Sequence, residues 1–247
     1  MRFTILKAGT ATRYGREVLG DYDGMFRALL AGEGEVWEVH DVENGAFPPD
    51  LARFDGVVVT GSASAAYDQA PWIGRLLQTI GEAHALEIPL LGVCFGAQAV
   101  ALALGGAVAP NPGGWDIGLT DLTLSPAAEA LPGFAPAPNP LRVLQTHYDA
   151  VTRMPDGGVL LASSDKTEVE MYRLGQRVLC LQGHPEMDRK EVEVILLKKP
   201  GLPEAVVESG LASLVETPDR EFLPGILRDF LRNGGLRRSQ PKTAAAP

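Results

Sequence analysis

The chain has 247 residues, 45% of them apolar, and its 22 basic and 31 acidic residues give a formal net charge of −9. This length and apolar fraction fit a single globular domain with a sizeable core. The acidic balance and the lack of any Lys/Arg run argue against a protein that binds nucleic-acid backbones.

Membrane and secreted classes are equally disfavoured. No stretch approaches the roughly 20 apolar residues that span a bilayer, and Lys7 and Arg13 precede any long apolar run, so no secretory signal is visible. The two cysteines, Cys94 and Cys180, cannot form a disulfide scaffold. We therefore expect a cytoplasmic protein without a membrane partner.

Predicted strands and helices alternate over the first hundred residues. The helix expected at 21–32 opens with an Asp cap and closes with Gly, and the one expected at 71–86 has Pro in its first turn. Apolar runs at 55–60 and 88–93 are typical of buried parallel strands. Further strands are expected at 3–9 and 35–40. This alternation predicts an α/β fold with an open, mostly parallel sheet.

Beyond residue 106 the pattern changes to short strands. They are expected within 115–124, 141–146, 158–164, 167–174 and 176–183, with "RLGQR" (173–177) as a hairpin turn. The Pro- and Ala-rich segment 125–140 reads as a loop with one helical turn. Two helical patterns follow near 203–215 and 219–232. We predict one domain over 1–233, with a helical extension from about 190, and a disordered tail over 234–247.

One cysteine has an unusual setting. Cys94 lies in "GVCFG" (92–96), between an apolar strand and an apolar helix. A sharp strand-to-helix turn crowds the backbone, so glycines two residues on either side relieve clashes, as in a nucleophile elbow. A helix N-terminus favours the reactive thiolate, and the Phe95 N–H points to where an oxyanion would form. Cys180 has no such frame and is predicted to be a core residue.

A nucleophilic thiol needs a base, and the base needs an orienting group. Among the four histidines, His184 directly follows a buried strand, and Glu186 lies two residues further on. Pro185 favours extended backbone at His184, in which alternate side chains point the same way. Glu186 can then fix the imidazole tautomer. His147 is the competing candidate. The order Cys–His–Glu differs from that of α/β-hydrolases.

These segments resemble the class I glutamine amidotransferases over about residues 1–190. The resemblance lies in "GVCFGAQ" (92–98), "QGHPEM" (182–187) and "VVVTGSASAAYD" (57–68). It implies a flavodoxin-like three-layer α/β/α fold, an open and mainly parallel sheet with antiparallel additions, and a Cys94–His184–Glu186 triad. It also implies a second oxyanion N–H near Gly61 and Ser62, beside that of Phe95.

Further segments are similar to one branch of this family, the stand-alone γ-glutamyl peptidases: "GGWDIG" (113–118), "LQTHYDAV" (144–151) and "SSDKTEVEMY" (163–172). The resemblance implies hydrolysis at a γ-glutamyl carbonyl of a small-molecule substrate. It maps Gln98, His147 and Tyr148 to the substrate pocket. The family often carries a larger residue where this chain has Ala97, which leaves the identity of the substrate open.

Three functions remain open at this point. The chain could be a γ-glutamyl peptidase acting on glutathione-like conjugates, or a glutaminase subunit that passes ammonia to a separate synthase. It could also be a non-catalytic binding or regulatory module on the same scaffold. No cofactor is implied, and no motif with metal-ligand spacing, such as H-E-x-x-H or paired C-x-x-C, occurs.

Overall fold

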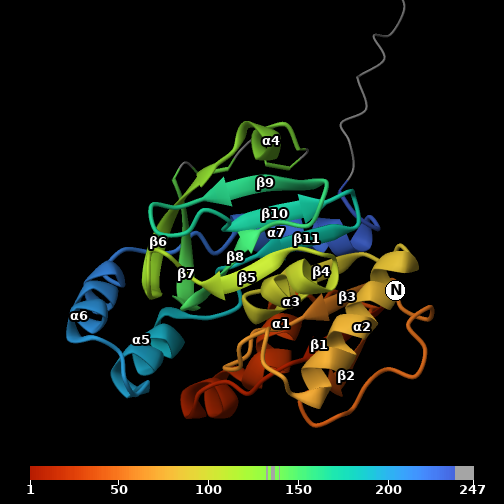
Figure 1. The fold of residues 1–247 in the computed structure, drawn as a ribbon, viewed down its shortest axis with the longest axis horizontal. Coiled ribbons are helices and arrows are strands. Elements are labelled where there is room, and N and C mark those ends of the chain that lie inside the picture. Colours follow the sequence, from red (N-terminus) through yellow and green to blue (C-terminus); the bar gives the residue numbers. More distant parts are fainter. Residues whose placement is uncertain (132, 135–136, 139, 237–247) are drawn as a thin grey trace, which may run out of the picture.

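The computed structural model describes residues 1–236 except 132, 135, 136 and 139. Its centre is a nine-stranded sheet in the order β2-β1-β3-β4-β11-β10-β9-β6-β7, and a second, two-stranded sheet pairs β5 with β8 (Figure 1). The strands are β1 Arg2–Lys7, β2 Val36–Asp41, β3 Gly56–Val59, β4 Leu90–Val93, β5 Ala107–Pro110, β6 Asp116–Leu124, β7 Leu141–His147, β8 Asp149–Arg153, β9 Gly158–Ser163, β10 Met171–Leu174 and β11 Val178–Leu181.

The large sheet has a parallel part and an antiparallel part. Strands β2, β1, β3, β4 and β11 run parallel to one another. Strand β11 then pairs antiparallel with β10, and the series continues antiparallel through β9, β6 and β7. The predicted hairpin between β10 and β11 is present, with Gly175 at a φ of 57° in its turn. The expected mainly parallel sheet with antiparallel additions is therefore confirmed.

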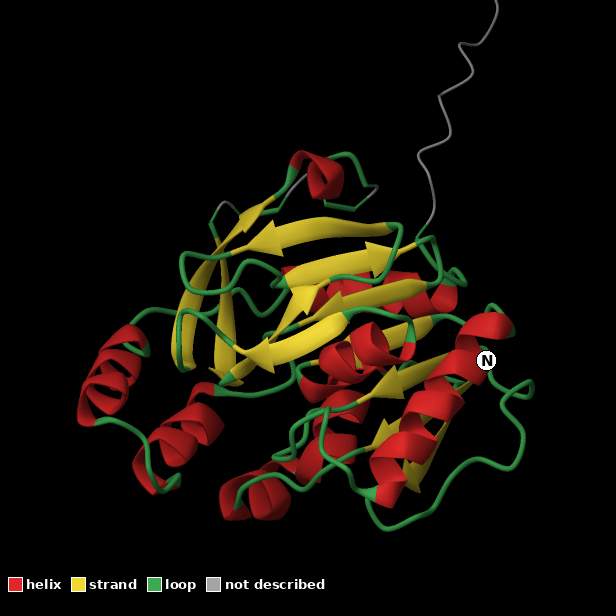
Figure 2. Cartoon of the chain, viewed as in Figure 1, coloured by secondary structure: helices red, strands yellow, loops and turns green. Residues whose placement is uncertain are grey.

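Helices cover both faces of the parallel strands (Figure 2). One face packs on α1 Asp21–Leu30 and α7 Phe222–Arg232, and the other packs on α2 Pro71–Ala85 and α3 Phe95–Ala103. Successive side chains of a strand point to opposite faces of the sheet. In β3, Val58 packs in the apolar cluster on the first face, and Val57 and Val59 pack in the cluster on the second. This gives the predicted three-layer α/β/α arrangement.

A third apolar cluster joins α1 to a later helix, α5 (Arg189–Lys198), beside the sheet. It brings Tyr22 and Met25 of α1 against Val192 and Leu196 of α5. Helix α6 (Glu204–Ser213) packs next to it, on β6. Asp188 caps α5, because its carboxylate accepts a hydrogen bond from the Glu191 N–H at 2.8 Å. Helices α5 and α6 thus form a wall at one side of the sheet.

Several local features differ from the sequence predictions. Helix α5, the short strands β5 and β8, and a π-helical turn at Gly15–Leu19 were not predicted; the alternating "EVEV" of α5 lacks a clear helical stripe. The Asp cap predicted for α1 is wrong. Gly20, at a φ of 82°, occupies the cap position, and Asp21 instead accepts from the Ala11 N–H and pairs with Lys7. The single helical turn expected in 125–140 is α4, Pro126–Glu129.

The end of the chain is described only in part. Leu236 lies against the apolar cluster under α7, and its N–H donates to the carbonyl of Gln176 at 2.8 Å. The remainder of the predicted disordered tail, 237–247, lies outside the described residues. Among the helices of the described residues, none combines the length and apolar character needed to cross a membrane.

Candidate active site

Parallel strands bring distant segments together at one edge of the sheet. Their carboxyl ends meet there, so the loop after β3, the turn after β4 and the segment after β11 are neighbours. Ser62, Cys94 and His184 come from these three segments and border one cavity of about 380 Å³. The full lining is Thr10, Ala11, Thr12, Arg13, Tyr22, Ser62, Ala63, Cys94, Thr146, His184, Glu191, Val194, Ile195, Lys198 and Lys199.

Cys94 forms the sharp turn that its glycine frame predicts. Its backbone has φ 53° and ψ −112°, a conformation that is strained for any residue with a side chain. A Cβ at Gly96 would lie 2.2 Å from the carbonyl oxygen of Val59, and one at Gly92 would lie 2.7 Å from the carbonyl oxygen of Gly96. Only glycine therefore fits on either side of the cysteine at these positions.

His184 and Glu186 make the predicted contact. The imidazole Nδ1 and the carboxylate Oε1 are 2.7 Å apart, and both side chains are buried. Pro185 and Glu186 form a turn instead of extended chain, but the side chains still meet. Burial by itself lowers the pKa of His184, but the Glu186 carboxylate and the neighbouring Cys94 outweigh burial and raise that pKa to about 10. The site therefore favours the protonated ring.

The sulfur of Cys94 is the ring's second neighbour. Both residues border the same cavity, and Cys94 raises the pKa of His184. Nε2 of His184 makes no hydrogen bond within the described part of the chain. Nδ1 bonds Glu186, so Nε2 is the nitrogen left to exchange a proton with the sulfur or with a bound molecule.

The predicted oxyanion donors lie beside the cysteine. Phe95 is the first residue of α3, and an N–H in the first turn of a helix has no acceptor within that helix. Ser62 borders the cavity. Gly61 lies directly against the base, since a Cβ placed on it would be 3.1 Å from Cε1 of His184. Close approach of this loop to the ring thus depends on a glycine at residue 61.

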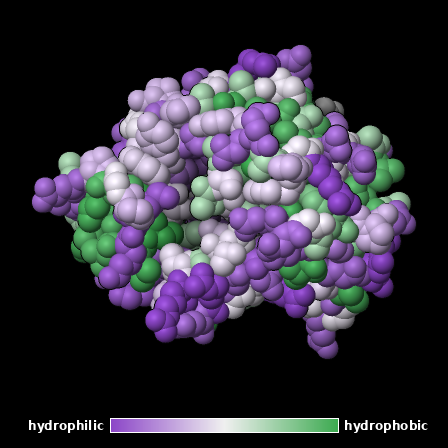
Figure 3. Space-filling view, turned by 60° about the horizontal axis from the view of Figure 1, so that its bottom comes forward, coloured by the Kyte–Doolittle hydropathy of each residue, from purple (hydrophilic) through white to green (hydrophobic). Residues whose placement is uncertain are grey.

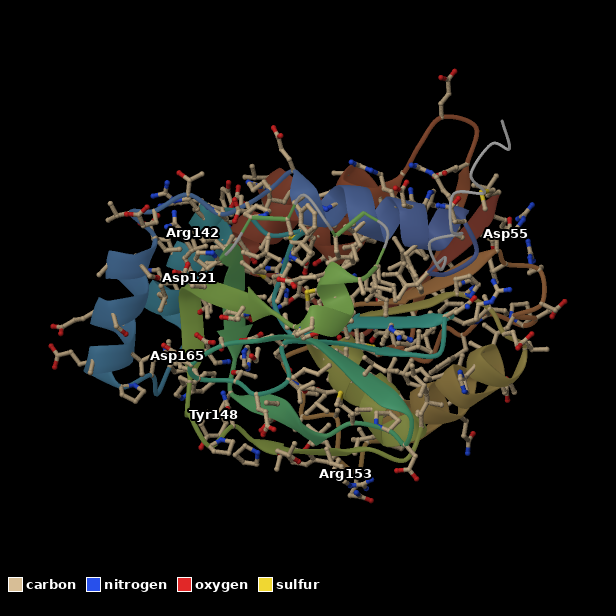
Figure 4. All side chains as sticks on the ribbon, turned by 90° about the horizontal axis from the view of Figure 1, so that it is seen from above. Asp55, Asp121, Arg142, Tyr148, Arg153 and Asp165 are labelled. Atoms are coloured by element: carbon tan, nitrogen blue, oxygen red, sulfur yellow. The ribbon has the colours of Figure 1, made fainter. Side chains whose placement is uncertain are left out.

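The three residues mapped to the substrate pocket do not border this cavity. Gln98 is buried and its amide nitrogen donates to the carbonyl of Asp149 at 2.8 Å. His147 is buried, with Nδ1 3.1 Å from the same carbonyl. Tyr148 lies at the periphery of the molecule, 41% exposed, and its ring packs on Trp115 (Figure 4). Their role in binding substrate stays a prediction.

A buried polar cluster lies next to His147. One ligand atom each from Asp116, His147 and Glu170 falls within 4.8 Å of the others, a set that could hold a cation. Protein donors already engage both acids, since Asp116 Oδ1 lies 3.5 Å from the Lys166 ammonium and Glu170 accepts from the Gln145 amide at 2.8 Å. Burial lowers the pKa of His147 to about 4 and raises that of Glu170 to about 8, so this histidine is neutral.

Sequence reasoning missed several residues that border the cavity. Tyr22 of α1 is buried there, and burial together with the charges of Cys94 and Glu186 raises the pKa of its phenol, which keeps the hydroxyl protonated. Glu191 of α5 accepts from the backbone N–H of Thr12 at 3.0 Å and also from its hydroxyl, which ties the N-terminal loop to α5. Neither residue stands in a recognisable motif, so only the fold reveals them.

Comparisons with known proteins agree with this geometry. The family model for glutamine amidotransferase class-I matches residues 33–199. Gamma-glutamyl peptidase 3 of Arabidopsis thaliana is 31% identical over 242 residues, covering 94% of this chain and 96% of the relative. The GMP synthase [glutamine-hydrolyzing] of Leifsonia xyli is 34% identical over 157 residues, which are 60% of this chain and 30% of that protein.

Solved structures give the same result for the fold. A glutamine amidotransferase from Thermotoga maritima superposes with a TM-score of 0.70 at 24% identity, covering 95% of this chain and 97% of the other. The cysteine turn, the strand-end histidine and the sheet order occur here in a chain whose sequence matches the family model over most of its length. The chain belongs to the class I glutamine amidotransferase family.

Proposed function

We propose that this protein hydrolyses a γ-glutamyl amide bond through a thioester on Cys94. The observation that carries the proposal is the meeting of the strained Cys94 turn with the His184–Glu186 pair at one cavity. A thiol beside a charged imidazole, with helix N–H groups next to it, is suited to acyl transfer. Similarity to γ-glutamyl peptidases over nearly the whole chain supports the choice of acyl group.

The first half of the reaction forms the thioester. The Cys94 sulfur bonds to the γ-carbonyl carbon, and the carbonyl oxygen becomes an oxyanion beside the Phe95 N–H and the Ser62 (or Gly61) N–H. His184 then gives its Nε2 proton to the amide nitrogen, and the C–N bond breaks to release an amine. Glu186 stabilises the imidazolium before this step and orients the ring during it.

The second half consumes water. The neutral ring of His184 accepts a proton from a water molecule, whose oxygen bonds to the thioester carbon. The oxyanion forms again at the same donors, and its collapse breaks the C–S bond, releasing glutamate and regenerating the thiolate with a protonated His184. The substrate and one water molecule are the only reactants that these steps require.

A second candidate differs only in what leaves. A glutaminase subunit releases ammonia for a separate synthase. The similarity of 60% of this chain to a GMP synthase supports this candidate. The γ-glutamyl peptidase relative matches the chain over 94% of its length, against 60% for the GMP synthase. We therefore place peptidase activity first.

A panel of substrates separates these functions. Purified protein and its Cys94→Ala variant are assayed with glutamine, glutathione and a bulky S-conjugate of glutathione, following glutamate release. Turnover of the peptides without a partner, lost in the variant, is the expected result. Turnover of glutamine alone, and only with an added synthase, would favour the glutaminase subunit. A Cys94 that is also inert toward a glutamine-mimicking electrophile would indicate a non-catalytic module.

A further inference from the structure

The cavity beside Cys94 is positively charged although the protein is acidic. Besides Cys94 and His184, its charged lining comprises Arg13, Lys198 and Lys199 against one carboxylate, Glu191. That carboxylate is fully buried and is already engaged by the N–H and hydroxyl of Thr12. A chain with a net charge of −9 therefore presents an excess of positive charge around its reactive sulfur.

The two lysines are the cations best placed to meet a ligand. Arg13 is 81% exposed and pairs with Glu17 at 2.8 Å, so its charge is largely offset. Lys198 and Lys199 have no carboxylate within 4 Å in the part of the chain that the structure describes. The Lys199 ammonium lies 5.2 Å from the centre of the Trp115 ring, which holds it by a cation–π contact.

Apolar side chains separate these lysines from the catalytic residues. Val194 and Ile195 of α5 border the same cavity one turn before Lys198 and Lys199. Figure 3 shows the molecule hollowed beside the lobe at the left, where Figure 1 places α5 and α6. The cavity thus has a reactive end, an apolar wall and a cationic rim, and its volume of about 380 Å³ suits a small ligand.

The position of His184 indicates which part of a substrate enters this space. The leaving nitrogen must approach Nε2 of His184 to receive its proton. Whatever is attached to that nitrogen then continues into the cavity that His184 and α5 share. Gln98 does not border this cavity, and its amide nitrogen is engaged by the carbonyl of Asp149 and by Gln182.

We propose that the α5 wall is a leaving-group subsite, in which Lys198 and Lys199 bind the terminal carboxylate of a peptide attached to the γ-glutamyl group. The two lysines are specificity-determining residues and take no part in the chemical steps. This inference rests on the proposed γ-glutamyl hydrolysis and adds to it the two residues that recognise the free carboxylate of the leaving peptide.

The test compares two substrates that differ only at that carboxylate. They are γ-glutamyl-alanyl-glycine and its C-terminal amide, with glutamine as a substrate that has no leaving peptide. The variant is Lys198→Gln/Lys199→Gln. Lys190→Gln is the matched control, because Lys190 is on the same helix, pairs with Glu193 at 2.9 Å and does not border the cavity. Lys198→Arg/Lys199→Arg retains the charge, and thermal melting checks that each variant folds.

The double glutamine variant should raise KM for the free acid about three- to tenfold, the range for partly exposed charge pairs, and leave kcat unchanged. KM for the amide and for glutamine should not change, and the arginine variant should behave like the wild type. An equal rise for acid and amide would overturn the proposal, because it would mean that the lysines bind the α-carboxylate of the glutamyl group. No change for any substrate would also overturn it.

A binding measurement keeps this inference distinct from the proposed function. Calorimetry with the inactive Cys94→Ala protein should show tighter binding of the acid than of the amide, with the difference lost in the added double glutamine substitution. If the acid binds preferentially but the wild type hydrolyses neither peptide, the proposed reaction fails while the carboxylate subsite stands. If hydrolysis occurs with equal affinity for acid and amide, the subsite fails and the reaction stands.

Discussion

Replacing Glu186 by Gln tests the central electrostatic feature of the site. The change keeps the shape of the side chain and removes the charge 2.7 Å from Nδ1 of His184. The pKa of His184 is about 10, against an ordinary value of 6.5, because the Glu186 carboxylate and the neighbouring Cys94 overcome the effect of burial. At about 1.4 kcal/mol per pH unit, this difference corresponds to a net value of about 5 kcal/mol in favour of the protonated ring, after the opposing effect of burial.

Two kinetic effects should follow in Glu186→Gln. The value of kcat/KM should fall by roughly 10²–10⁴, since the ring loses both its orienting charge and much of its preference for the protonated form. The alkaline limb of the pH profile, where His184 loses its proton, should move from near pH 10 toward neutrality. Glutamate release from a γ-glutamyl peptide, followed between pH 5 and 10.5, measures both.

The charge of Glu186 also makes the stability of the protein depend on pH. Because the folded-state pKa of His184 is raised, its contribution to the free energy of unfolding is complete below about pH 6.5 and is lost as pH rises through about 10. The wild type should therefore lose more stability over this range than Glu186→Gln does. Wild-type kcat/KM together with an unmoved alkaline limb in a folded variant would refute the role assigned to Glu186.

Three further outcomes follow from the turn and the core. Cys94→Gly and Cys94→Ala should both lack turnover. Because φ is 53° at this position, the glycine variant should be more stable than the alanine variant by about 1 kcal/mol in chemical denaturation. A more stable alanine variant would contradict the backbone strain assigned to Cys94. Gly96→Ala should destabilise by several kcal/mol or prevent folding, because its Cβ would lie 2.2 Å from the Val59 carbonyl oxygen. The control Gly81→Ala, in open space on α2, should stabilise by about 0.5–1 kcal/mol, and equal melting temperatures would refute the packing argument. Iodoacetamide should label Cys94 and spare Cys180, because burial raises the pKa of the Cys180 thiol to about 12. Peptide mass spectrometry of the labelled native protein measures both sites, and fast labelling of Cys180 would contradict its burial.

The local sequence determined the features that depend on neighbouring residues. The glycines around Cys94 predicted a strand-to-helix turn, because steric crowding at such a turn acts over two or three residues. The two-residue spacing of His184 and Glu186 predicted their contact, although the backbone there forms a turn and not the extended chain from which the contact was predicted. Runs of apolar residues predicted the buried parallel strands, since a strand covered on both faces has no polar side.

Tertiary structure alone decided what surrounds the reactive sulfur. Tyr22 and Glu191 border the cavity because α1 and α5 pack together across more than 160 residues of chain, and no short-range pattern encodes that contact. Helix α5 itself escaped prediction, because its "EVEV" segment has no strong helical period and packing on the third apolar cluster stabilises it. The cationic rim exists only because that helix ends beside the sheet's carboxyl edge.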